Sequence, residues 1–208
     1  EKCMLVSVSI ENWMSFRDNV TFSMIASKER QHGERVPKIG KYQTRILPIA
    51  ALFGANASGK TNFCKALKFA RLLVVDGTRT DQRIPVEPFK MTTTKQQRLS
   101  RFRFELLIDE TMYEFSFAVN AQEVAEERLV MITSTSEKVL YHRHDGTIDF
   151  EHALRNDKFL QFAFRGTREN QLFLTNSVTQ NVKNFQPVFD WFKHSLVLVA
   201  PDSRLGLI

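Results

Sequence analysis

The residues with the most specific chemistry lie together between positions 54 and 61. The run Gly-Ala-Asn-Ala-Ser-Gly-Lys-Thr fits the pattern G-x-x-x-x-G-K-[ST], in which a loop turns successive backbone N–H groups inward at the start of a helix. Such a loop gathers the many donors that a triphosphate needs within a small radius. We expect Lys60 to reach the β and γ phosphates and the Thr61 hydroxyl to take one coordination position of Mg²⁺. The pattern therefore predicts a site for ATP and Mg²⁺.

This motif needs a strand before it and a helix after it. Residues 46–53 are a short apolar run, which predicts a buried strand, and residues 61–75 repeat apolar side chains at helical spacing. An ordinary glycine turn before a helix is the alternative interpretation, and the flanking elements favour the phosphate loop. The predicted nucleotide-binding residues of the loop are Gly54, Asn56, Ala57, Ser58, Gly59, Lys60, Thr61 and Asn62.

The first half of the remaining chain alternates apolar and polar residues. This period of two over residues 4–25 predicts a strand, a turn and a second strand, and the polar residues 26–45 predict a loop. Residues 101–119 alternate strongly, which predicts an antiparallel hairpin that turns at Asp109 and Glu110.

The second half changes from strands to helices. Short strands are expected over residues 129–132, 138–143 and 147–150. From residue 151 the spacing is helical, with Pro187 in the first turn of a helix. A last apolar strand is expected over residues 196–200.

Composition sets limits on the class of protein. With 208 residues, 43% hydrophobic and 25% charged, the chain should fold around a core and is unlike disordered or disulfide-scaffold proteins. No apolar run is long enough to span a bilayer, and two cysteines favour reduced thiols in a cytoplasmic protein. The net charge of +6 suits a polyanionic partner without requiring one. The basic residues 28–45 and 95–103 could contact nucleic acid, or be basic through solvation alone.

The chain resembles one family. The version of the loop over residues 54–62, which ends in Asn62, resembles the ABC-type ATPase heads of the SMC group and their relatives in prokaryotic phage defence. So does the opening, in which Ile-Glu-Asn-Trp-Met-Ser-Phe-Arg at residues 10–17 separates two strands. The nearest resemblance is to the PtuA ATPases of Septu and retron systems, and it covers most of the chain. Its other landmarks are residues 87–89, 113–115, 127–129, 172–174 and 191–192.

The resemblance implies an α/β fold, namely a P-loop NTPase of the ABC-ATPase head type. Such heads have a partly parallel core sheet, an antiparallel β lobe and C-terminal helices. Residues 1–208 would then be the N-terminal portion of one head. Its parts would be residues 1–75 with the loop and first helix, residues 76–150 as the β lobe, and residues 151–208 as a helical segment with a final strand.

The resemblance also implies a function. Heads of this kind are ATPases that form a homodimer or higher oligomer around ATP and often control a partner nuclease, here in anti-phage defence. Carried over by position, Asn56 and residues 59–61 would contact phosphates, and Gln180 would sense Mg²⁺ and the γ-phosphate. Where many relatives have a basic residue after the Asn-aromatic pair, this chain has Met14, so no nucleotide contact is expected from that position.

Hydrolysis in this group also needs an acidic residue after a buried strand, a following glutamate and a serine-glycine-rich signature loop. The sequence contains no such loop. Residues 106–110, Leu-Leu-Ile-Asp-Glu, resemble the sequence of an apolar strand that ends in the acidic residues. However, Glu105 interrupts the apolar run, and the alternation favours a hairpin turn. Asp202 is a weaker candidate because Pro201 separates it from the apolar run. We therefore expect the catalytic residues beyond Ile208, and little activity from residues 1–208 alone.

Other interpretations remain. His142 and His144 share a strand face without a third ligand nearby in sequence, which favours a solvent-facing strand over a metal site. A P-loop kinase or GTPase is disfavoured because no Asn-Lys-x-Asp motif is present and the antiparallel segment is long. The alternatives to an ATPase head are a non-hydrolysing nucleotide-binding scaffold and a nucleic-acid-binding module.

Overall fold

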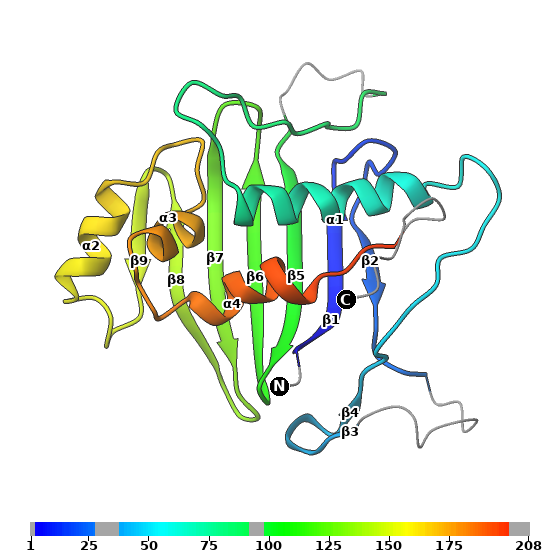
Figure 1. Ribbon diagram of the computed structural model, residues 1–208, viewed down its shortest axis with the longest axis horizontal. Helices are drawn as coiled ribbons and strands as arrows, with labels where there is room; N and C mark the ends of the chain where they lie inside the picture. The colour runs from blue at the N-terminus through cyan, green and yellow to red at the C-terminus, as the bar shows by residue number, and fades with distance from the viewer. Residues whose placement is uncertain (1–2, 28–37, 92–97, 200–208) are drawn as a thin grey trace.

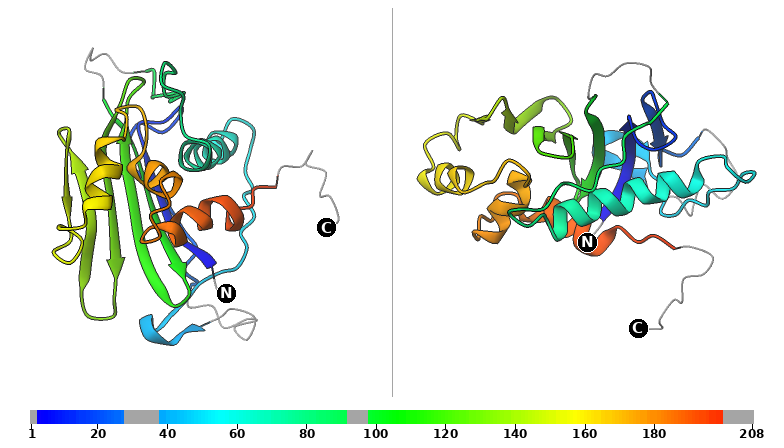
Figure 2. Two further views of the ribbon diagram at one scale, coloured as in Figure 1. Left: turned by 60° about the vertical axis from the view of Figure 1, so that its left-hand side comes forward. Right: turned by 90° about the horizontal axis from the view of Figure 1, so that it is seen from above.

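The computed structural model describes residues 3–27, 38–91 and 98–199. Within these ranges the chain forms a seven-stranded sheet in the order β2-β1-β5-β6-β7-β8-β9, with helices against one of its faces (Figures 1 and 2). The strands of this sheet are β1 (Cys3–Glu11), β2 (Val20–Ser23), β5 (Ser100–Ile108), β6 (Thr111–Val119), β7 (Val124–Ile132), β8 (Glu137–His144) and β9 (Thr147–Phe150).

The helices follow the sheet in two groups. The 16-residue α1 (Lys60–Val75) crosses the sheet in front of its central strands (Figure 1). The C-terminal helices are α2 (Lys158–Arg165), α3 (Phe173–Thr179), α4 (Gln186–Asp190) and the π-helix η3 (Trp191–Ser195). A small hairpin of β3 (Lys38–Ile39) and β4 (Thr44–Arg45), joined by the turn η2 (Gly40–Tyr42), stands apart from the large sheet.

The core lies between the sheet and the helices, because the strands alternate as the sequence predicts. Phe102, Phe104 and Leu106 of β5 are fully buried, as are Phe115 and Phe117 of β6. They pack in one cluster with the apolar face of α1 and with the C-terminal helices. The apolar area that these aromatic side chains remove from water provides the main driving force for folding.

Most of the other face of the sheet is polar, although a second, smaller apolar cluster of Val6, Met24, Ile39, Ile46 and Leu107 packs on it beside the β3–β4 hairpin. Arg101 forms an ion pair with Glu126 at 2.8 Å, and Arg128 forms one with Glu114 at 3.1 Å. One buried and one solvated face is the usual form of an antiparallel sheet. The strands and hairpins expected from the period of two are confirmed, and so are the first helix and the position of Pro187 in the first turn of α4.

A buried hydrogen-bond network joins the sheet to α3. The Glu127 carboxylate of β7 accepts bonds from the backbone N–H groups of Phe173 and Leu174, at 2.6 and 2.9 Å, and from the Tyr141 hydroxyl at 2.8 Å. The Arg143 guanidinium lies 3.7 Å from the same carboxylate. Burial raises the pKa of Glu127, although Arg143 and these three donors act against the rise.

Two sequence predictions of strands were wrong. Residues 46–53 form no strand, and their only ladder contact is an isolated bridge from Ile46 to Ile25. Residues 196–199 of the expected last strand are irregular, and Ala200 lies outside the described residues. Both segments are apolar enough for strands, but a strand needs a hydrogen-bonding neighbour along its length. Residues 46–53 find one only at their start, where Ile46 bridges to Ile25 and the Leu47 N–H donates to the Met24 carbonyl oxygen at 2.7 Å.

The parallel core sheet expected from the resemblance is not found in the described ranges. Every strand pair there is antiparallel. The first two strands belong to the same sheet as the expected β lobe, since β1 pairs with β5 along its whole length. The phosphate-loop helix therefore rests on an antiparallel sheet.

Candidate nucleotide-binding site

The predicted phosphate loop lies at the N-terminus of α1. The helix begins at Lys60, with Gly59 as its N-cap residue at φ 91°. A side chain at position 59 would be strained at this φ, and its Cβ would lie 3.4 Å from the Phe16 ring and 3.5 Å from the Ser15 hydroxyl oxygen. The pattern's second glycine is therefore favoured by the backbone conformation, whereas these distances are ordinary van der Waals contacts.

Lys60 holds the loop together. Its ammonium nitrogen donates to the carbonyl oxygens of Gly54 and Ala55, at 2.6 and 2.7 Å, and to the Ser58 hydroxyl at 3.1 Å. No carboxylate among the described residues forms an ion pair with it. The positive charge of Lys60 thus lies in the loop, at the positive end of the α1 dipole.

The loop is open to solvent. Residues 51–58 are exposed, and so is Thr61. The first N–H groups of α1 have no acceptor within the helix, as at any helix N-terminus. Free N–H donors, an unpaired ammonium and an accessible hydroxyl together form a donor set that suits a polyphosphate with a bound cation.

A second element supports the loop. The turn between β1 and β2 closes through reciprocal backbone bonds between Trp13 and Phe16, at 2.9 and 2.7 Å. From this turn the Trp13 indole N–H donates to the Asn62 carbonyl oxygen at 2.9 Å, and the Asn62 amide donates to the Ser15 hydroxyl at 3.0 Å. The turn therefore fixes the first turn of α1 on the sheet.

Sequence reasoning missed this supporting role. The resemblance marked residues 10–17 as a landmark without a function, and Met14 was considered only as a nucleotide contact. The signal for the contact is weak, because Trp13 and Asn62 are 49 residues apart in sequence. The Met14 N–H instead donates to the Glu87 carbonyl oxygen at 2.8 Å, which ties the turn to the segment before β5.

The structure separates Gln180 from the phosphate loop. Gln180 is the C-cap residue of α3, and the Thr175 hydroxyl of that helix donates to the Val74 carbonyl oxygen at 2.8 Å, near the C-terminal end of α1. The loop is at the opposite end, and the rise from Lys60 to Val74 is about 21 Å at 1.5 Å per residue. The expectation that Gln180 joins the metal and γ-phosphate site of its own chain is therefore corrected.

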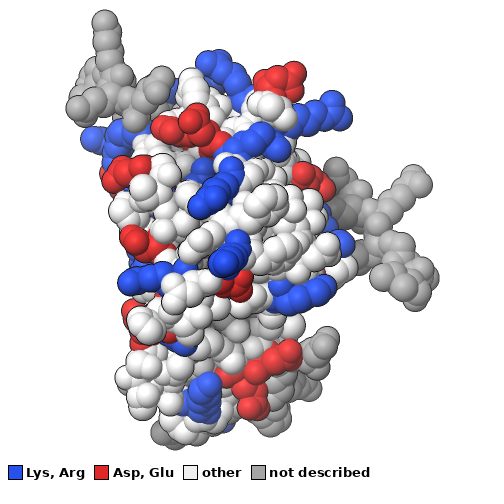
Figure 3. Space-filling model, turned by 90° about the vertical axis from the view of Figure 1, so that its left-hand side faces the viewer, with Lys and Arg blue, Asp and Glu red and all other residues white. Residues whose placement is uncertain are grey.

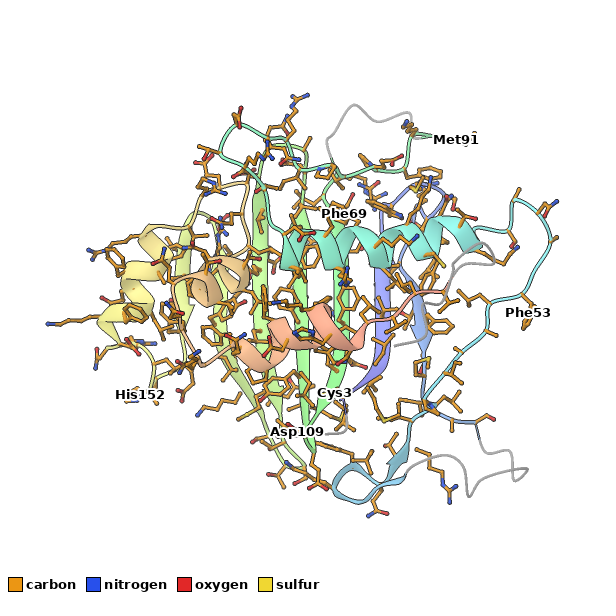
Figure 4. All side chains as sticks on the ribbon, in the orientation of Figure 1. Cys3, Phe53, Phe69, Met91, Asp109 and His152 are labelled. Atoms are coloured by element: carbon orange, nitrogen blue, oxygen red, sulfur yellow. The ribbon has the colours of Figure 1, made fainter. Side chains whose placement is uncertain are left out.

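The acidic pair at the β5–β6 turn lies far from the loop. Asp109 and Glu110 are exposed, have φ values of 45° and 66°, and form the two-residue turn of the hairpin, as predicted. Figure 4 shows Asp109 at the far end of the sheet from Phe53, which directly precedes the loop. Asp202, the other acidic candidate, lies outside the described residues.

The arginines described in the second basic segment have carboxylate partners. Arg98 pairs with Glu11 at 3.1 Å and Arg101 with Glu126 at 2.8 Å, while Arg103 lies 3.9 Å from Glu114. Figure 3 shows acidic and basic side chains interspersed on the face that it presents. Such pairs leave little uncompensated charge for a phosphate backbone, and residues 28–37 of the first basic segment lie outside the described ranges.

A family model matches residues 49–205, so the match begins just before the loop and continues through the sheet and the C-terminal helices. The family is described as "AAA domain, putative AbiEii toxin, Type IV TA system". The chain belongs to this family of AAA domains. No curated protein matches the sequence.

Membership places the phosphate loop in an AAA-type ATPase domain, a class that binds nucleotide and generally uses ATP with Mg²⁺. The structure's donor set at residues 54–61 agrees with that class. Among the described residues of the AAA domain, no cluster of three His, Cys, Asp or Glu could hold a metal ion. His142 lies against Glu126 and His144 against Asp149, at 3.2 and 3.4 Å, on the polar face of the sheet.

None of the described helices combines the length and the apolar character that crossing a bilayer requires.

Proposed function

We propose that this AAA domain is the ATP-binding head of an SMC/ABC-like ATPase, which closes on a second copy around nucleotide and controls a partner effector in anti-phage defence. The observation that carries the proposal is the phosphate loop at the start of α1, with the Lys60 ammonium in its centre. The family match supports the nucleotide. The partner effector and its context rest on the resemblance of the sequence alone.

In this proposal the chain's own residues do three things. The backbone N–H groups of the loop and of the first turn of α1 bind the phosphates, and Lys60 exchanges bonds to its own loop carbonyls for bonds to phosphate oxygens. The Thr61 hydroxyl binds Mg²⁺, which supplies charge neutralisation between the β and γ phosphates. Trp13 and Asn62 keep these donors in place.

An exposed apolar segment directly before the loop suggests that another surface packs over the loop region. Directly before the loop, Ile49 and Phe53 are 81% and 91% exposed, and Leu52 is 40% exposed. A run of large apolar side chains in solvent marks a site of contact. We propose that another part of the ATPase head covers this segment and supplies the acid that positions water.

The proposal is tested by the nucleotide dependence of association. The protein should be mainly monomeric without nucleotide and dimeric with Mg²⁺ and a slowly hydrolysed ATP analogue, as measured by sedimentation velocity. The Lys60→Ala variant should stay monomeric under both conditions. A dimer fraction that is the same with and without nucleotide would contradict ATP-driven closure and favour the non-hydrolysing scaffold.

A further inference from the structure

A cavity of about 310 Å³ lies at the edge of the sheet where β1 and β6 end and β5 begins. Residues of the segment before β5, including Val86 and Phe89, form one wall, and the β6–β7 turn with Gln122 forms another. Figure 1 shows this segment running along the upper edge of the sheet, on its way back from the end of α1. The volume is at the small end of the range typical of sites for small molecules, about 300 to 1,000 Å³.

The walls of the cavity carry net positive charge. Two arginines, Arg83 and Arg98, line it, and no acidic side chain of the described residues does. Arg98 is paired with Glu11 at 3.1 Å, whereas Arg83 is exposed and has no carboxylate partner in the described ranges. The Gln122 side-chain amide likewise makes no hydrogen bond to a described residue. An unpaired guanidinium beside an unbonded amide suits an anionic group that accepts several hydrogen bonds.

The rest of the lining is apolar or aromatic. Val119 is fully buried at the base, and Val86 and Pro88 contribute to the wall. Phe89 is half-buried, and its ring makes no contact with another aromatic ring of the described residues. An aromatic ring with no stacking partner, next to a cation, suits a ligand that has a flat ring as well as a negative charge.

We propose that this cavity is a second ligand site, separate from the phosphate loop, for a small organic anion that carries a flat ring and is about the size of a nucleoside monophosphate. Arg83 binds the anionic group, Phe89 packs on the ring, and Gln122 donates to a polar edge. This site can bind its ligand whether or not the phosphate loop binds ATP.

The cavity is connected to the phosphate loop through Asn12. The Asn12 side chain accepts from the Phe89 N–H at 3.2 Å and donates to the Arg98 carbonyl oxygen at 2.8 Å, and its own carbonyl oxygen accepts from the Ser100 hydroxyl at 2.6 Å. All three partners of Asn12 line the cavity. The next residue, Trp13, donates to the Asn62 carbonyl oxygen in the first turn of α1. A ligand that shifts Phe89 or Arg98 would therefore shift Asn12 and the adjoining turn at Trp13, which supports the loop.

The experiment uses the Lys60→Ala variant, in which we expect binding at the phosphate loop to be weakened. Titration calorimetry with AMP should still show one site, with the affinity that the cavity has in the unmodified protein. Adding Arg83→Ala should weaken AMP binding about tenfold or more, because one charge-assisted contact to the anion is lost. Adding Arg155→Ala instead, which removes an exposed arginine at a distance from the cavity, should leave the affinity unchanged. Melting temperatures of all variants establish that they fold.

Several outcomes would overturn the proposal. If AMP, GMP, CMP and UMP all fail to bind the Lys60→Ala variant, the cavity is not a separate site for this class of ligand. Inorganic phosphate that binds as tightly as AMP would contradict the role of Phe89, and adenosine that binds as tightly would contradict the role of Arg83. Because these measurements use a variant without Lys60, a negative result would contradict the cavity site but not ATP binding at the loop. A loss of ATP binding at the loop would likewise not contradict the cavity site.

The connection is tested separately on the unmodified protein. Saturating AMP should change the ATP affinity of the loop by about fivefold or more, and ATP should change the AMP affinity by the same factor, because coupling between sites is reciprocal. The change should disappear in Arg83→Ala. An ATP affinity that does not respond to AMP would contradict the coupling through Asn12.

Discussion

The indole N–H of Trp13 donates to the carbonyl oxygen of Asn62 at 2.9 Å, and this bond joins the end of β1 to the first turn of the phosphate-loop helix. Trp13 is 2% exposed, and its ring packs against Phe69 and Phe102 at centroid distances of 4.9 and 5.5 Å. A buried aromatic side chain with one polar atom can thus set the position of the loop relative to the sheet.

Replacing Trp13 by Phe should weaken ATP binding by a few-fold and destabilise the fold by about 1 to 2 kcal/mol. The substitution keeps an aromatic ring in the core but removes the hydrogen bond to Asn62, and it leaves a small cavity. Trp191→Phe is a matched control, because the buried indole nitrogen of Trp191 has no hydrogen-bond partner among the described residues. Equal ATP affinities for the two variants, measured by calorimetry, would show that the Trp13 bond does not support the loop.

We expect the buried carboxylate of Glu127 to contribute strongly to the stability of the fold. Glu127→Gln should lower the free energy of unfolding by about 3 to 5 kcal/mol, because it leaves Arg143 without its charge partner and turns an NH2 group toward one of the two backbone N–H donors. The neighbouring Glu126→Gln, on the polar face, should cost no more than about 1 kcal/mol. Urea unfolding measures both, and similar losses would contradict the structural role of Glu127.

The acidic turn of the β5–β6 hairpin should take no part in the site. Asp109→Asn combined with Glu110→Gln should leave Mg²⁺-dependent ATP binding unchanged, and should alter stability by about 0.5 kcal/mol or less, because both side chains are exposed. Titrations with and without Mg²⁺ measure this. If the double variant loses its Mg²⁺ dependence, one of the two carboxylates contacts the metal.

Hydrolysis should need more than the described residues supply. Residues 1–208 should turn over ATP far below about 1 s⁻¹, the low end of typical enzyme rates, since no carboxylate within the described ranges forms an ion pair with Lys60. A phosphate-release assay on the purified protein measures this rate. Sustained turnover near about 1 s⁻¹ would mean that a catalytic base within these residues has been overlooked.

Local patterns predicted most of the fold. The strands from β1 to β9 of the large sheet, the two-residue turn at Asp109 and Glu110, and the start of α1 at Lys60 follow from alternation, turn residues and the loop motif. These features depend on residues close in sequence, which is why one sequence is enough to find them.

The failures involve contacts between distant segments. Residues 46–53 have the composition of a buried strand, but whether they form one depends on a neighbouring strand that the described residues do not contain. The assignment of Gln180 was based on sequence resemblance alone. The packing of α3 at the far end of α1 shows where Gln180 lies. The support of the loop by Trp13 was missed for the same reason.

The central claim is that Lys60 in the loop binds the phosphates of ATP, and calorimetry on Lys60→Ala with MgATP tests it most directly. The variant should bind at least about tenfold more weakly, because an ammonium and its charge-assisted bonds to phosphate are lost. Lys65→Ala, which removes an exposed lysine further along α1, should bind like the unmodified protein. If Lys60→Ala binds MgATP as tightly as the unmodified protein, the nucleotide site is not at this loop.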